Sequence, residues 1–286
     1  MTLTTCTHPK TASATDRTAV GVRATARILA AARSGTTALP VLDGDGPFEL
    51  RRLRSLGTQA RVCIVGAMSA PLGGDRLRFE VTVQQGAALH ITSAAATLAL
   101  RGPTSAPATY DVHLTVGDHA RLHWLPKPLI CAAGSDLRQT WTIDLAPSAR
   151  LVLREEQILG RTGEPPGHVT TRLTVRRGGR TLLDQQAAYG PGEPGWDGPA
   201  VLAGNRATGQ LLVVDPAFEE NAPEVRLLGG ARQDSQAVLT PLAGPATLVT
   251  AVAPDSRLLR RLLNTAQHTY RQPFTGLTFN DAVPPA

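Results

Sequence analysis

Cysteine is scarce in this sequence. Its three cysteines, Cys6, Cys63 and Cys131, are odd in number and far apart, which argues against a disulfide framework and against a CxxC metal site. An apolar run long enough to cross a bilayer is also missing, and residues 1–20 lack the basic and apolar regions of a secretory signal. We therefore expect a cytoplasmic protein that does not bind membranes.

Aromatic residues and lysine are also rare. Aromatic residues make up 4% of the chain, and the only lysines are Lys10 and Lys127, so arginine supplies most of the positive charge. The net charge of +6 would suit nucleic acid, but the basic residues are scattered singly and no aromatic residues are arranged for stacking on bases. We interpret the charge as a solvated surface, expect no nucleic-acid binding, and keep an acidic protein partner as an alternative.

The usual motifs of catalytic sites are missing as well. The sequence has no GxxxxGK[ST] phosphate loop, no HExxH metal motif, no GxSxG elbow and no GxGxxG between a strand and a helix. The phosphate loop is the motif that P-loop NTPases require, so this class is excluded. We assign no catalytic residues.

Glycine and proline, in contrast, are frequent. The 27 glycines and 22 prolines interrupt the chain too often for long helices, which favours a strand-rich protein. Residues 1–20 are predicted to form a disordered tail, and residues 21–286 a single β domain. Residues 24–35 fit a helix by propensity and a strand by their weak alternation.

One strong helix is predicted near the C-terminus, over residues 255–272. Asp255 or Ser256 can serve as its N-cap. Four leucines recur at helical spacing and form one apolar stripe, which we expect to pack on a sheet or on a partner. These are Leu258, Leu259, Leu262 and Leu263.

Three stretches share one pattern, at residues 77–91, 111–124 and 141–153. In each, apolar residues alternate, a short polar turn follows, and the phrase Ala-x-Leu-x-apolar comes next. The last apolar residues before the turn are Val83, Val116 and Leu145, and the leucines after it are Leu89, Leu122 and Leu151. We interpret each copy as a hairpin that cannot be stable alone, so the copies are expected to stack as a solenoid-like coil or as a sandwich.

Four histidines fall in or near these repeats, at His90, His113, His119 and His123. His90 and His123 hold equivalent places, so stacking would bring them together, and paired imidazoles can bind nickel, copper or zinc. The alternation places them away from the buried residues. We therefore interpret them as surface histidines.

The stretch EEQILGRTGEPPGH, residues 155–168, gathers carboxylates, an arginine and a histidine around glycines. Such a group can serve general acid/base chemistry. Glu155 and Glu156 are adjacent, however, so on a strand they face opposite sides. The alternative is structural, with Arg161 bridging a carboxylate while the glycines turn the chain.

Three motifs together resemble the urease accessory protein UreD family, also called UreH. They are LGGDRLRFEVTV at 72–83, the phrase ending HWLPKPLI at 123–130, and REEQILGRTGEPPG at 154–167, and the resemblance runs from about residue 20 to the C-terminus. It favours a strand at 24–35. The motif residues that we expect to be structural are Gly73, Gly74, Leu125, Pro126, Pro128, Gly160, Arg161 and Gly163.

The resemblance implies an all-β, solenoid or β-helix-like stack of hairpins with a C-terminal helix and few others. It also implies a non-enzymatic scaffold that binds apo-urease and UreF, which recruits the GTPase UreG, so that nickel is inserted into urease. The family is thought to offer an internal passage for nickel, with no tightly bound cofactor and nickel only in transit. Asp75, Glu156 and Glu164 are our candidates for lining it, and the leucine stripe is our candidate for docking UreF.

The sequence departs from the family at two places. Residues 93–102, SAAATLALRG, replace a phrase that carries lysine and tyrosine in the family. Residues 125–128 are LPKP where the family usually has LPQP, so Lys127 replaces a glutamine. Two other functions remain open. One is a carboxylate-dependent hydrolase on a β-helix, and the other is a stand-alone metal-binding or interaction module.

Overall fold

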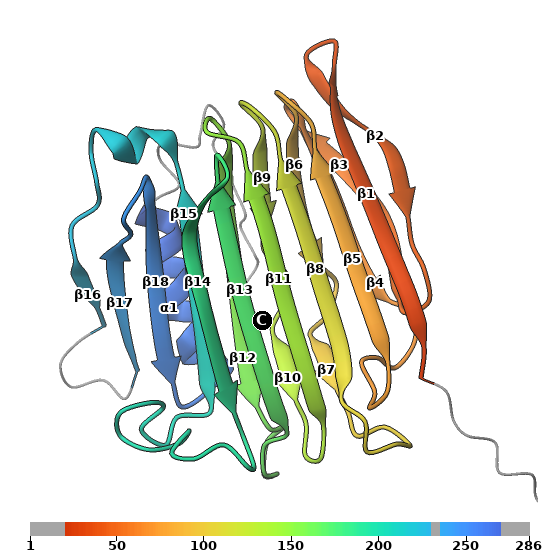
Figure 1. The fold of residues 1–286 in the computed structure, drawn as a ribbon, viewed down its shortest axis with the longest axis vertical. Helices are drawn as coiled ribbons and strands as arrows, with labels where there is room; N and C mark the ends of the chain where they lie inside the picture. Colours follow the sequence, from red (N-terminus) through yellow and green to blue (C-terminus); the bar gives the residue numbers. More distant parts are fainter. Residues whose placement is uncertain (1–20, 230–234, 270–286) are drawn as a thin grey trace, which may run out of the picture.

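The computed structural model describes residues 21–229 and 235–269. These residues form two β-sheets that lie face to face, with one helix on the outer side of the larger sheet (Figure 1). The predicted tail at 1–20 lies outside the described residues. The described part of the chain contains no helix with the length and apolar character needed to cross a membrane.

The smaller sheet has seven strands, and its middle is parallel. In spatial order the strands are β14 (Arg180–Tyr189), β13 (His168–Arg177), β11 (Asp136–Leu145), β8 (Ala108–Val116), β5 (Arg76–Val83), β1 (Arg23–Arg33) and β2 (Thr36–Asp43). The five inner strands, from β13 to β1, pair in parallel, while β2 and β14 pair antiparallel at the two edges.

The larger sheet has eleven strands, of which two short ones lie off its main path. The main path runs β16 (Arg226–Leu228), β17 (Gln236–Pro241), β18 (Ala246–Ala253), β15 (Ala207–Val214), β12 (Arg150–Leu159), β9 (Arg121–Trp124), β6 (Ala88–Ser93), β4 (Gln59–Gly66) and β3 (Phe48–Leu56). The short strands are β7 (Thr97–Ala99) and β10 (Leu129–Cys131). A 3-10 turn, Pro216–Glu219, and the helix α1, Ser256–Thr269, complete the described elements.

The chain passes from one sheet to the other within each repeat. β5, β8 and β11 lie in the smaller sheet, and β6, β9 and β12 lie in the larger sheet. Each strand pairs in parallel with its counterpart in the next repeat, with Val83 opposite Val116 and Leu145 opposite Val116. This confirms the predicted solenoid-like stack and its alignment. The two strands of a repeat do not pair as a hairpin, because facing each other across the core lets both of them bury their apolar sides.

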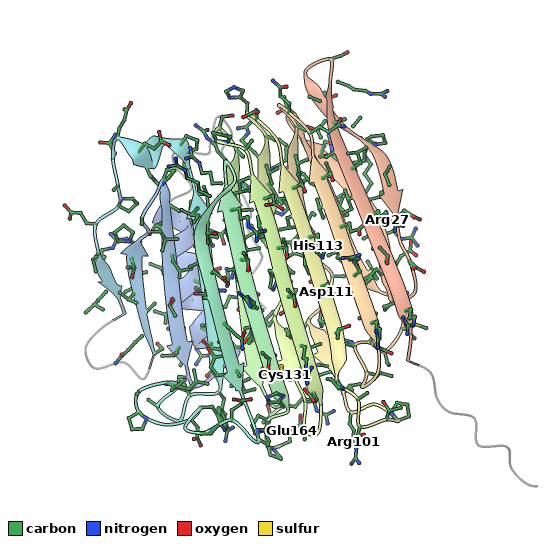
Figure 2. The ribbon with its side chains drawn as sticks, in the orientation of Figure 1. Arg27, Arg101, Asp111, His113, Cys131 and Glu164 are labelled. Carbon is green, nitrogen blue, oxygen red and sulfur yellow. The ribbon has the colours of Figure 1, made fainter. Side chains whose placement is uncertain are left out.

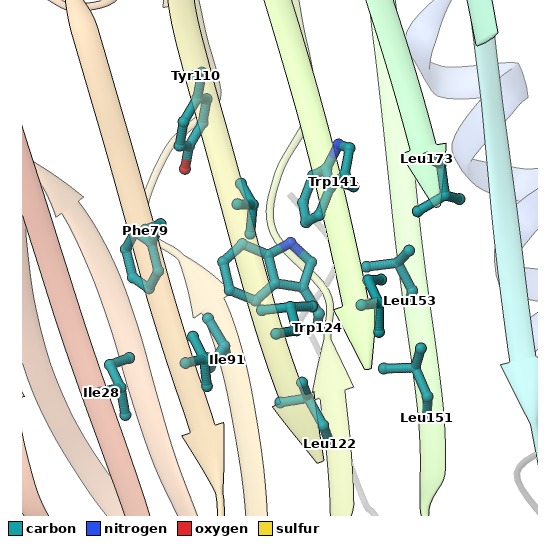
Figure 3. Packing of buried hydrophobic residues seen from close by; sticks show 14 of the residues in the cluster. Ile28, Phe79, Ile91, Tyr110, Leu122, Trp124, Trp141, Leu151, Leu153 and Leu173 are labelled. Carbon is teal, nitrogen blue, oxygen red and sulfur yellow. The ribbon is translucent and has the colours of Figure 1, made fainter. Parts of the chain in front are cut away.

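The core lies between the sheets and is centred on aromatic residues (Figure 3). Trp124 of the larger sheet meets Phe79 and Trp141 of the smaller sheet edge to face, with ring centroids 5.4 Å and 5.5 Å apart. Such pairs add stability beyond the burial of their area. Residues 24–35 are confirmed as mainly strand, because the apolar side of β1 joins this core.

Replacing Trp124 with alanine is expected to lower the free energy of unfolding by about 3–5 kcal/mol, because a cavity would remain between Phe79 and Trp141. Thr82→Ala, on the exposed outer face of β5, is the control and should change it by less than about 0.5 kcal/mol. Urea denaturation followed by circular dichroism measures both. Equal losses in the two variants would contradict the central place of Trp124.

Candidate functional site

Strand β12 is buried on both faces, whereas a strand of a two-sheet structure commonly has one face toward the solvent. The smaller sheet covers one face and α1 covers the other. Leu151 and Leu153 belong to the core between the sheets, and the alternation carries Glu155 to the same inner side. Arg154 and Glu156 therefore lie on the outer side, beneath α1.

The larger sheet has a gap beside the middle of β12. On this side β9 pairs with residues 150–153, and β10 pairs with residues 157–159. Between β9 and β10 the chain runs through Leu125, Pro126, Lys127 and Pro128. A proline has no backbone N–H to donate to a neighbouring strand, so this phrase cannot continue the ladder. The motif LPKP therefore opens the sheet.

A cavity of about 350 Å³ lies at this gap and reaches between the sheets. It is lined by residues of the smaller sheet, such as Tyr110 and Gln139, and by residues 154–157 of β12. A second cavity of about 130 Å³ adjoins Glu155 and Gln157 and is lined further by Thr171, Gln185, Tyr189, Thr208 and Gln210. Glu155 and Gln157 border both. We call the two cavities, with these two side chains between them, the polar track.

Glu155 is the one acidic residue that borders both cavities of the polar track among the described residues. Gln210 donates a hydrogen bond to its carboxylate, and Gln185 donates one to Gln210, so a polar chain joins the two sheets. Burial raises the pKa of Glu155 to about 7, against the opposing effect of Gln210. The Trp141 indole also lowers this pKa, although its N–H falls short of a well-formed hydrogen bond.

Several buried polar atoms beside the track have no hydrogen-bond partner within the described part of the protein. They include one carboxylate oxygen of Glu155 and the hydroxyl of Thr171. Buried polar atoms are usually satisfied by protein or by ordered water. The track therefore offers unsatisfied polar atoms and enough space for ordered water.

Glu156 belongs to a different group of charges. It pairs with Arg154 at 2.9 Å, and Arg260 of α1 approaches it at 4.0 Å. Arg154 also donates a hydrogen bond of 2.6 Å to Asn264 on the same helix. Burial lowers the pKa of Arg154, while Glu156 raises it. Glu156 borders the larger cavity, but its charge is balanced by Arg154, so its place along a metal path stays a prediction.

Asp75 stabilises a turn rather than bordering either cavity of the polar track. One carboxylate oxygen accepts a hydrogen bond from the N–H of Val22, the other accepts one from Leu72, and both distances are 2.8 Å. The preceding Gly74 has φ +95°, a conformation that favours glycine. The GGD motif thus connects β1 to the start of β5. The expected contact of Asp75 with a metal path stays a prediction.

Glu164 lies in the turn after β12. It pairs with the guanidinium of Arg161 at 2.8 Å and accepts hydrogen bonds from the N–H groups of Arg161 and Ala133. These bonds lower the pKa of Glu164 to about 2. The turn uses Gly160 and Gly163 at positive φ. Arg161 therefore bridges a carboxylate while the glycines turn the chain, as the structural alternative expected for this part of the motif. Figure 2 shows Glu164 near Cys131 at one end of the sheets.

The three predicted metal-path carboxylates are therefore not brought together. Asp75 lies in the turn before β5, and Glu156 lies under α1. Glu164 lies in the turn after β12. His168, at the end of the same motif, bridges Asp136 and Glu193, with 2.9 Å to each carboxylate. It holds the glycine-rich loop that follows β14 against β13.

The histidines of the repeats lie on outer faces. His90 and His123 are register partners, and their rings are 6.0 Å apart, as stacking predicts. His113 is 3.1 Å from a nitrogen of Arg78 on the exposed face shown in Figure 2, and His119 is exposed in a turn. Within the described ranges, no group of three histidine, cysteine or acidic side chains could hold a metal ion.

Helix α1 begins near the predicted place, with Asp255 accepting a hydrogen bond of 2.8 Å from the N–H of Leu258. The predicted residues 270–272 lie outside the described residues. Leu259, Leu262 and Leu263 are buried against the larger sheet. These three pack on the larger sheet, which is one of the two alternatives expected for the stripe. The chain itself therefore covers them, and the docking of a partner by the stripe stays a prediction. Leu258 is only partly buried.

Sequence reasoning missed most of the polar track. Gln139 and Thr171 occupy inward positions of their strands, where the pattern otherwise has apolar residues. That break in the alternation is the signal that could have found them. For β12, the same alternation selects Glu155 rather than Glu156 as the inward carboxylate.

Comparison with known proteins gives one consistent family. The sequence profile of a family described as UreD urease accessory protein matches residues 22–283. Urease accessory protein UreD 2 of Saccharopolyspora erythraea is 59% identical over 262 residues, which are 92% of each chain. Urease accessory protein UreD 3 of Streptomyces griseus subsp. griseus is 62% identical over 86% of this chain and 96% of its own. Urease accessory protein UreD of Frankia alni is 35% identical over 87% and 93%.

The buried Glu155 predicts a pH dependence of stability. Because its pKa rises from 4.5 to about 7 on folding, the folded protein favours the protonated carboxyl. This contribution is complete below about pH 4.5 and is lost as the pH rises through about 7. The wild type should lose on the order of 1–3 kcal/mol relative to Glu155→Gln across this window. Denaturation of both proteins at a series of pH values measures this, and parallel curves would argue against the burial of Glu155.

The packing of α1 predicts that its leucines stabilise the isolated chain. Leu259→Ala should lower the free energy of unfolding by about 2–5 kcal/mol, because Leu259 is fully buried. Arg257→Ala, on the exposed side of the same helix, should change it by less than about 0.5 kcal/mol. Urea denaturation tests both. A Leu259→Ala chain as stable as the wild type would mean that the stripe serves a partner instead.

Proposed function

We propose that this chain, which belongs to the UreD family of urease accessory proteins, acts in urease maturation as a non-catalytic scaffold for nickel insertion. In this proposal it works in the cytoplasm and binds apo-urease and UreF, and UreF brings the GTPase UreG. The continuous core between two paired sheets supports this role, since such a frame holds its surfaces in fixed positions.

We further propose that nickel passes along the polar track. The observation that carries this idea is the place of Glu155, a buried carboxylate that borders both cavities. The uncharged polar side chains that line the cavities with it, such as Gln139, Thr171 and Gln210, carry amides and hydroxyls, which are weak ligands for a divalent ion. A single carboxylate among weak ligands suits an ion that has to be released again, whereas a cage of histidine or cysteine would retain it.

The raised pKa of Glu155 fits this task. With a pKa of about 7, the side chain is close to half-ionised at neutral pH. An approaching divalent cation favours the charged form, because opposite charges lower the pKa of a carboxyl. Glu155 would then be neutral while the track holds only water and negatively charged when the ion arrives.

The geometry offers less support for the alternatives. A carboxylate-dependent hydrolase needs two acids that face one substrate. Glu155 points between the sheets, whereas Glu156 is paired with Arg154 beneath α1. A stand-alone metal-binding module would bind nickel tightly in the absence of urease, which equilibrium dialysis of the isolated chain would reveal.

Glu155→Gln is expected to reduce nickel-dependent activation of urease by about tenfold while leaving the complex with urease intact. The amide keeps the size and the contact with Gln210 but cannot become charged, and a barrier higher by about 1.4 kcal/mol slows transfer tenfold. Co-expression with urease, UreF and UreG, followed by urease assays and a pull-down, measures both. Glu220→Gln, at an exposed position, is the control.

Full activation by the Glu155→Gln chain would refute a role of this carboxylate in nickel transfer. Failure of the wild-type chain to capture any urease component would instead refute the scaffold. The pull-down and the activity assay thus separate the two parts of the proposal.

A further inference from the structure

An open groove lies where the gap in the larger sheet meets the start of α1. It has a volume of about 800 Å³ and is bordered by residues 94–96, by the turn after β12 and by residues 254–256. Apolar side chains of β10 and β12, Ile130 and Ile158 among them, also line it. Its cationic side chains are Lys127, Arg161, Arg206 and Arg260. We call it the basic groove.

The acids of the basic groove do not balance these cations. Glu164 neutralises Arg161, because the two side chains form an ion pair at 2.8 Å. Asp255 caps α1 through the N–H of Leu258. Arg260 reaches Glu156 only at 4.0 Å, and 44% of its side chain is exposed. The groove therefore presents a net positive charge to the solvent.

The basic groove and the polar track adjoin each other. Residues 94–96 and Lys127 line both the groove and the larger cavity of the track. Lys127 itself belongs to the phrase between β9 and β10 at the gap in the larger sheet. The positive charge of Lys127 repels other cations nearby. In the isolated chain, this end of the track is therefore unfavourable for a divalent cation.

We propose that the basic groove docks an acidic segment of a partner protein. Carboxylates of that segment would pair with Lys127 and Arg260, and its aliphatic side chains would cover Ile130 and Ile158. The docked segment would replace the positive charge at the gap by a neutral or negative one. This last step rests on the proposed nickel path, whereas the docking itself does not.

The lining favours a protein over a nucleic acid. None of the described residues that line the groove is aromatic, and binders of single-stranded nucleic acid use aromatic rings to stack on bases. The apolar lining would meet only charged phosphates and sugars in a duplex. An acidic segment with leucine or isoleucine satisfies both the charges and the apolar surface.

A fluorescein-labelled peptide of glutamate and leucine is the probe, and a peptide with glutamine in place of glutamate is its control. Fluorescence anisotropy with the full chain should show binding of the acidic peptide only, and binding should weaken with salt. Lys127→Glu combined with Arg260→Gln should weaken it on the order of tenfold or more. Arg257→Glu combined with Arg261→Gln, the same charge change on the exposed side of α1, should leave it unchanged.

Equal weakening by both double variants would show attraction to overall charge and would overturn the proposal. The same holds if the acidic peptide does not bind, or if a single-stranded oligonucleotide displaces it as well as unlabelled peptide does. Should the groove variant fail to fold, a photo-crosslinking acidic peptide on the unaltered chain decides. Crosslinks at 94–96 or 158–164 support the proposal, and crosslinks elsewhere overturn it.

None of these measurements involves nickel. The docking can therefore fail while Glu155→Gln still reduces urease activation, and it can hold when Glu155→Gln has no effect. The two results separate the basic groove from the nickel path.

Discussion

The burial of one sheet's apolar face against the other is the interaction on which the rest of this structure depends. No repeat can bury its own two strands alone, so successive repeats stack and each strand pairs with its counterpart. The contact of Trp124 with Phe79 and Trp141 ties the two sheets together at the centre. Because the register of parallel strands is fixed by this packing, every inward side chain has a fixed place, including the polar ones.

The polar track is the exception that this core tolerates. Burying a carboxylate and several amides is unfavourable unless they find partners. Part of that cost is offset by the chain from Gln185 through Gln210 to Glu155, and part is avoided because burial lets Glu155 take up a proton. Such an arrangement contributes little to stability that leucine could not supply. The presence of this arrangement at the middle of the molecule is therefore better explained by function than by folding.

Much of the fold follows from local patterns, whereas the site depends on strands that are distant in sequence. The repeats could be aligned to the residue because alternation and turn length together fix which positions match. The same alternation fits a hairpin and two strands in facing sheets, so the choice between them needed the structure. The helix over Ser256–Thr269 was predictable, and its leucine stripe fitted a sheet or a partner, so the choice between these two surfaces needed the structure. The track combines side chains from β11, β12, β13, β14 and β15, and no single stretch reveals that combination.

The gap beside β12 is set by the backbone rather than by the size of side chains. Pro126 and Pro128 lack the amide hydrogens with which the chain between β9 and β10 would form ladder hydrogen bonds to residues 154–156. Substitution of the surrounding side chains would therefore leave this gap in the hydrogen-bond ladder open. The opening needs no moving part and no ligand to create it. The side chains beside the gap, in contrast, decide its charge, and in this chain Lys127 lies there.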